Sequence, residues 1–172
     1  MNIQHLSTQY ETKILTHQNI DEIYELCLGN PLYYDYCPPS ITKDQILADM
    51  KALPPHKSFE DKFYIGFFQN QKLIAVLDLI LRYPDSNTAF IGFFMMHSKQ
   101  QRKGKGSALI EEICKELQHE FKSIRLGVIQ DNPQASHFWK KNQFLPTGII
   151  AHTDLYDITI MERQLTDSCH FH

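Results

Sequence analysis

The residues with the clearest chemical pattern form the segment 102–107, RKGKGS, which joins an apolar run (90–96) to a segment with apolar residues at helical spacing (107–121). A helix start carries unpartnered backbone N–H groups and partial positive charge, so it can bind an anion. Glycines permit positive φ and let several N–H groups point at one phosphate, while lysine and arginine add donors. The residues are Arg102, Lys103, Gly104, Lys105, Gly106 and Ser107. We therefore predict a ligand that carries phosphate.

Spacing separates this segment from two common phosphate motifs. A Walker A loop needs Ser or Thr directly after Gly-Lys, but Gly106 follows Lys105 here. The dinucleotide-binding fingerprint needs a third small residue where Leu109 stands. Neither motif fits, and the alternative to a binding loop is an ordinary surface turn with solvated cations.

A different signature does match. Gln101-x-x-Gly104-x-Gly106 resembles the Q/R-x-x-G-x-G/A pattern of the GNAT superfamily of N-acetyltransferases, whose loop holds the pyrophosphate of coenzyme A. A second stretch, residues 128–144, resembles the family's other signature, in which Asn132 opens a helix that carries an aromatic pair. The resemblance implies that residues 101–107 bind the pyrophosphate of acetyl-CoA and that Asn132 contacts the pantetheine arm.

Composition sets the broad class. The chain has 172 residues, 42% hydrophobic and 22% charged, so we expect one domain over residues 1–165 and a flexible tail over residues 166–172. The net charge of −3 argues against a general affinity for nucleic acid or an anionic membrane. Without a long apolar run or a signal pattern, the expected location is cytoplasmic. The spacing of cysteines and histidines predicts no metal site.

The order of patterns predicts the fold class. Apolar, turn-bounded runs predict strands, and helical spacing with cap residues predicts helices. The expected strands are 10–15, 59–69, 72–83, 88–97, 123–130, 144–151 and 155–163, and the expected helices begin near 19, 42, 107 and 132. Together with the resemblance, this order predicts an α/β fold with a mixed, mostly antiparallel, six- to seven-stranded central sheet flanked by helices, the GNAT-like acyl-CoA N-acyltransferase fold.

The resemblance also implies where the cofactor enters. In GNAT-like proteins the strand before the phosphate loop and the strand after its helix splay apart at a bulge, and coenzyme A enters the gap. Pantetheine would then pair with the backbone of Met95 and Met96. Such pairing needs no particular side chain, so we expect both side chains to be core.

The usual base and acid of the family are missing. The family often has a glutamate near the start of the fourth strand, but Thr88-Ala89-Phe90 contains no carboxylate. The nearest replacement is Asp78, whose pKa would rise in an apolar strand, as suits a general base. Alternatively, Asp78 lies on a hydrated face or pairs with Arg82.

Trp139 stands where the family commonly has a tyrosine that acts as the general acid. An indole N–H does not supply a proton at usable pH, so Trp139 would pack against the cofactor or belong to the core. Protonation of the leaving thiolate would fall to Tyr156, another tyrosine or water.

Substrate recognition is expected outside the two signatures. Tyr33, Tyr34 and Asp35 lie in an aromatic segment (32–39) interrupted by prolines, which we interpret as a loop. An acid among aromatic faces would attract an ammonium group, although an ordinary surface loop is the alternative.

The sequence therefore predicts an N-acetyltransferase that moves an acetyl group from acetyl-CoA to a primary amine, on a small molecule or a peptide, by direct attack. One alternative is a non-catalytic acyl-CoA-binding module. Another is nucleic-acid binding through the cations of 102–105, which the acidic chain disfavours. The sequence leaves the oligomeric state open, and a homodimer could form by pairing of the last strands.

Overall fold

The computed structural model describes residues 1–165 of the chain, so the predicted tail at 166–172 lies outside the described residues. The strands are β1 (Glu11–Ile14), β2 (Lys62–Gln69), β3 (Lys72–Leu81), β4 (Thr88–Met96), β5 (Ser123–Ile129), β6 (Leu145–His152) and β7 (Asp157–Gln164). The α-helices are α1 (Ile20–Leu28), α2 (Pro31–Tyr36), α3 (Lys43–Lys51), α4 (Lys105–Leu117) and α5 (Pro133–Lys141). Four short 3-10 turns complete the described elements: Ile3–His5, His17–Asn19, Phe59–Asp61 and Ser98–Gln100.

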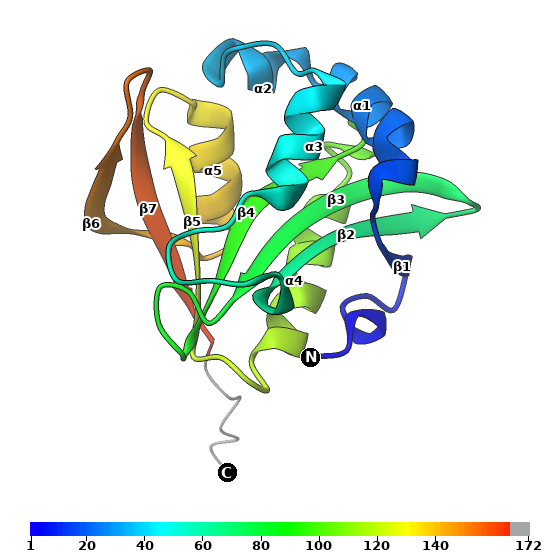
Figure 1. The fold of residues 1–172 in the computed structure, drawn as a ribbon. Helices are drawn as coiled ribbons and strands as arrows, with labels where there is room; N and C mark the ends of the chain where they lie inside the picture. Colours follow the sequence, from blue (N-terminus) through cyan, green and yellow to red (C-terminus); the bar gives the residue numbers. More distant parts are fainter. Residues whose placement is uncertain (166–172) are drawn as a thin grey trace.

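All seven strands belong to one sheet with the order β1-β2-β3-β4-β5-β7-β6 (Figure 1). β4 and β5 run parallel, joined through α4, and every other neighbouring pair is antiparallel. The sheet is flanked by helices on both faces (Figure 1). The predicted fold class is therefore confirmed.

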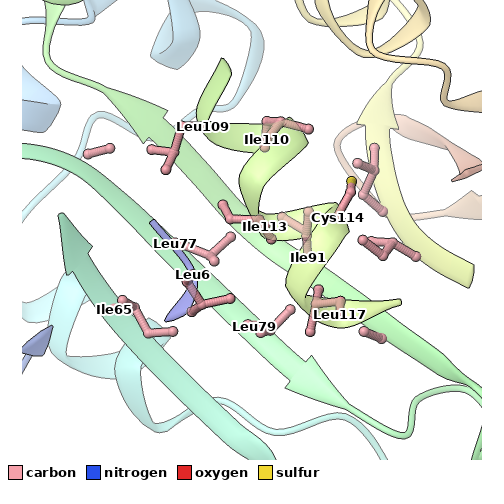
Figure 2. Packing of buried hydrophobic residues seen from close by; sticks show 14 of the residues in the cluster. Leu6, Ile65, Leu77, Leu79, Ile91, Leu109, Ile110, Ile113, Cys114 and Leu117 are labelled. Atoms are coloured by element: carbon pink, nitrogen blue, oxygen red, sulfur yellow. The ribbon is translucent and has the colours of Figure 1, made fainter. Parts of the chain in front are cut away.

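Helix α4 covers one face of the sheet, and α1 and α3 lie on the other (Figure 1). The buried side of α4 is the stripe that helical spacing indicates: Leu109, Ile110, Ile113, Cys114 and Leu117. Figure 2 shows this stripe against Leu77, Leu79 and Ile91 of the sheet, with Leu6 and Ile65 beside them. This packing fixes the start of α4 relative to the end of β4, and hence the position of the segment between them.

The β2–β3 hairpin turns at Asn70 and Gln71, as predicted. Both residues have positive φ, 51° and 63°, as in the tight turns whose twist matches that of the two strands. The hairpin places Asp78 of β3 opposite Tyr64 of β2.

Three predictions about local structure were wrong. Residues 59–61, expected to begin a strand, form a 3-10 turn, and the strand starts at Lys62. Residues 31–36 form α2 rather than the start of a loop, because Pro31 occupies the first turn of this helix, where a missing N–H costs nothing. Helix α4 begins at Lys105, two residues earlier than the apolar spacing indicates, and ends at Leu117. The cationic segment is therefore partly helical. None of the helices within residues 1–165 is long and apolar enough to cross a membrane.

Candidate active site

Strands β4 and β5 pair over only part of their length. The parallel ladder runs from Thr88 opposite Ser123 to Ile91 opposite Leu126. Beyond this point each strand continues without the other as its partner, so the edge of β4 that faces β5 is open (Figure 1). The structure thus has the gap between the two strands that the family resemblance implies.

A bulge lies where the strands separate. Asp78 is opposite Phe93 and Leu79 is opposite Ile91, which leaves Gly92 as the extra residue on β4. A Cβ atom at position 92 would lie 2.7 Å from Oδ2 of Asp78. Only glycine fits here, because the Asp78 carboxylate occupies the space that a side chain would need.

A cavity of about 70 Å³ occupies the gap between the strands. We call it the smaller cavity, and its lining residues are Tyr33, Ile91, Phe94, Leu126, Gly127, Val128, Ile129, Asn132, Ala135 and Trp139. Asn132 is buried and caps α5, since its Oδ1 accepts from the Ala135 N–H at 3.0 Å. The indole of Trp139 packs edge-on against Phe94, Phe138 and Phe144. Both residues of the second signature therefore line the gap.

Residues 101–104 precede α4, and residues 105–107 form its first turn. We refer to all seven residues as the loop of residues 101–107. Gly104 is the residue before the first turn and has φ of +73°, the left-handed conformation that glycine adopts without strain. A Cβ at Gly106 would lie 3.3 Å from Cε2 of Phe138, so the absence of a side chain lets α4 approach α5 closely. Arg102 and Lys103 are exposed, and neither forms an ion pair with any residue from 1 to 165.

Gln101 and Lys105 have partners within the protein. Nε2 of Gln101 donates to the carbonyl of Met96 at 3.0 Å and to the side-chain oxygen of Asn30. Nδ2 of Asn30 donates to the same Met96 carbonyl. Nζ of Lys105 donates to Oε1 of Gln100 at 2.6 Å. Gln101 thus anchors the loop to the end of β4 and to the segment after α1, while Ser107 lies half-buried in the first turn of α4.

The side chains of Met95 and Met96 are buried in two different core clusters, on opposite faces of the sheet. Their backbone pairs with β3 on one side only. On the other side β4 has no strand partner past Ile91 within the described chain. The Met96 carbonyl already accepts from Gln101 and Asn30, so an extended ligand would bind the other polar groups of that edge.

A second, larger cavity of about 350 Å³ lies between α2, α3, the sheet and the β6–β7 turn. It is lined by Cys27, Tyr33, Tyr34, Cys37, Pro38, Pro39, Ile41, Gln45, Ile46, Asp49, Tyr64, Phe93, Leu155 and Tyr156. Tyr33 lines both cavities, so they adjoin. Tyr33 and Tyr34, which we predicted to bind the substrate, line the same cavity as Tyr156, which we predicted as a proton donor.

Tyr156 reaches the larger cavity from the β6–β7 turn. Its hydroxyl lies 3.6 Å from Sγ of Cys37, and this contact, with burial, raises the pKa of Tyr156 to about 12. The phenol is therefore protonated at neutral pH and able to donate.

Asp78 lies neither on a hydrated face nor beside Arg82, but in the buried part of its strand, where its predicted rise in pKa is found. It is buried, and both its oxygens accept from Nζ of Lys62, at 2.8 and 2.9 Å. Arg82, the partner considered from the sequence, pairs with Asp61 instead. Burial raises the pKa of Asp78, and Lys62 offsets part of that rise. Asp78 lines neither cavity.

Asp35 is exposed and does not line the larger cavity, because α2 directs residues 33 and 34 inward and residue 35 outward. The carboxylate that does line it is Asp49 of α3, which sequence reasoning missed. A signal was present: Asp49 follows the buried Ile46 by three residues and so shares its helix face.

Comparison with known proteins agrees with this geometry. A sequence model of the Acetyltransferase (GNAT) family matches residues 20–144. No protein with a curated description matches the chain in sequence. An acetyltransferase from Thermus thermophilus has a similar structure, with a TM-score of 0.73, 18% identity, and coverage of 94% of this chain and 99% of that one.

Two further similar structures are of proteins with named substrates. A spermidine N-acetyltransferase from Vibrio cholerae, in complex with CoA and spermine, has a TM-score of 0.67 and 19% identity over 92% of this chain and 97% of that one. The ribosomal-protein-S18-alanine N-acetyltransferase from Escherichia coli has a TM-score of 0.64 and 16% identity over 94% and 97%. These likenesses show the fold. The family match shows more: the chain belongs to the GNAT acetyltransferase family.

Proposed function

We propose that this protein transfers an acetyl group from acetyl-CoA to a primary amine by direct attack. The observation that carries the proposal is the junction of the two cavities at Tyr33. One cavity lies in the strand gap beside an open strand edge, and the other has a separate, aromatic lining. Two substrates held on either side of Tyr33 would meet without a covalent enzyme intermediate.

The residues present fit coenzyme A. The left-handed Gly104 and the free N–H groups at the start of α4 would bind the pyrophosphate, with Arg102, Lys103 and Lys105 as cationic donors. The polar groups of the β4 edge near Met95 and Met96, other than the Met96 carbonyl held by Gln101 and Asn30, would pair with the pantetheine amides. Asn132 and Trp139 would flank the arm in the gap. When bound, acetyl-CoA supplies the thioester whose carbonyl carbon the amine attacks.

Two residues are proposed for proton transfer. Asp78 is proposed as the base, and because it lines neither cavity, a water molecule would carry the amine's proton to its carboxylate. The phenol of Tyr156 would donate a proton to the leaving thiolate and be restored from solvent.

Release of free thiol from acetyl-CoA, measured over a panel of primary amines, tests this proposal. Amine-dependent turnover, lowered in Asp78→Asn and in Tyr156→Phe, is the expected result. The placement of Asp78 outside both cavities is the observation that favours the second candidate, a non-catalytic acyl-CoA-binding module. Tight binding of acetyl-CoA with no turnover for any amine would support that candidate instead.

A further inference from the structure

The lining of the larger cavity contains an acidic residue and no basic one. Among its fourteen lining residues, Asp49 is the one acidic residue, and no lysine, arginine or histidine is included. A carboxylate in a partly enclosed aromatic site favours a cation and disfavours a second anion.

Asp49 has capacity left for a ligand. Its Oδ1 accepts from Nε2 of Gln45 at 2.8 Å, and within residues 1–165 no basic side chain pairs with its charge. Its charge is felt across the site, since it contributes to the raised pKa of Tyr64, Cys27 and Tyr156. A half-buried carboxylate without a cationic partner is a ready site for an ammonium group.

The aromatic lining suits the same ligand. The ring of Tyr33 meets Tyr34 edge-on at 5.0 Å and Phe93 at 5.9 Å, and Tyr64 lines the same cavity. Ring faces attract cations and cover alkyl chains. The Tyr34 hydroxyl is buried beside the Cys27 thiol, and burial together with this contact raises the pKa of Tyr34, so its phenol is a neutral part of the lining.

The β6–β7 turn and the segment after α2 meet at one side of the larger cavity, where Tyr156 contacts Cys37.

Asp49 lines the larger cavity and not the smaller one. A cation bound at Asp49 would therefore be distinct from an amine that reacts at the strand gap. This separation matters chemically, because a carboxylate beside the reacting amine would hold it protonated.

We propose, on the basis of the proposed acetyl transfer, that Asp49 is a specificity-determining residue that binds the second ammonium group of a small diamine. The acceptor has one amine at the strand gap, an alkyl chain along the tyrosines and a cation at Asp49. A carboxylate next to either amine would be repelled, so free amino acids are poor acceptors.

Three matched amines test this assignment: cadaverine, pentylamine, which lacks the second cation, and lysine, which adds a carboxylate. Wild-type protein should prefer cadaverine in kcat/KM. Asp49→Asn should raise KM for cadaverine by about tenfold or more, as for loss of a hydrogen bond to a charged group, and leave pentylamine unchanged. Asp49→Glu should restore part of the preference.

Asp44→Asn, on the exposed part of the same helix, is the control and should change neither amine. Equal loss with cadaverine and pentylamine in Asp49→Asn would show a structural role and overturn the assignment. So would a preference for lysine, or for peptides over all three amines. Failure of acetyl-CoA to bind wild-type protein would instead overturn the proposed function itself, so the two failures are distinguishable.

Discussion

Nζ of Lys62 donates to both carboxylate oxygens of Asp78, and the two side chains are only 3% and 11% exposed. The same carboxylate lies over Gly92, the extra residue of the β4 bulge. The ion pair therefore supports the place where β4 leaves β5. Because the gap between β4 and β5 begins there, the pair links the stability of the sheet to the shape of the candidate site.

Replacing Lys62 with methionine should destabilise the protein strongly. Asp78 would be left buried without a partner, which typically costs about 3–5 kcal/mol of the free energy of unfolding. Lys13→Met removes an exposed pair with Glu11 and should cost about 1 kcal/mol or less. Urea unfolding of both variants checks this, and similar small losses in the two would show that Asp78 is hydrated in solution.

The raised pKa of Asp78 sets a direction for pH dependence. In the unfolded chain its pKa is near 3.8. Between that value and the higher native pKa, the native state holds a proton that the unfolded state has lost, so stability falls as pH rises. The stability of wild type relative to Asp78→Asn should therefore decrease as pH rises through this window. Denaturant unfolding at a series of pH values measures it, and an increase would mean that Lys62 outweighs burial.

Tyr156→Phe should lower kcat by about a hundredfold with little change in KM, if its phenol protonates the thiolate. With a pKa of about 12, the phenol stays protonated through the alkaline range in which such assays run, so Tyr156 should add no alkaline limb to the rate profile. Tyr36→Phe, outside both cavities, serves as the control. A rise in KM alone would assign Tyr156 to acceptor binding.

Trp139 is the one tryptophan of the chain and lines the smaller cavity. Its emission should shift when coenzyme A fills the strand gap, because the ligand would change the polarity of the cavity that the indole lines. A fluorescence titration should give the same affinity as calorimetry. Calorimetric binding with unchanged emission would place the ligand outside the gap.

Much of the fold could be predicted because its signals are local. The stripe from Leu109 to Leu117 shows in helical spacing, and the β2–β3 turn at Asn70 shows between two apolar runs. The loop at Gly104 is indicated by the spacing Gln101-x-x-Gly104-x-Gly106. Short helix α2 was missed because residues 31–36 lack a full period of apolar spacing and precede two prolines.

The partners across the sheet could not be predicted. Lys62 meets Asp78 only because the hairpin register brings the two side chains together, and no sequence spacing states that register. Asp49 reaches the larger cavity through the packing of α3 on the sheet, which depends on contacts far apart in the chain. Sequence patterns therefore locate the loop of residues 101–107 at the start of α4 better than they locate the residues that line the larger cavity.

The central claim is that the loop of residues 101–107 and the strand gap bind coenzyme A, and isothermal titration of acetyl-CoA and free coenzyme A tests it most directly. Wild type should bind in the micromolar range. Gly104→Val should lose at least about tenfold in affinity, since a β-branched residue is strained at φ of +73°. Gly148→Val is a matched control, because Gly148 of β6 also has positive φ and open space around it, and should bind normally. Absence of binding to wild type, or equal affinity in wild type and Gly104→Val, would contradict the account.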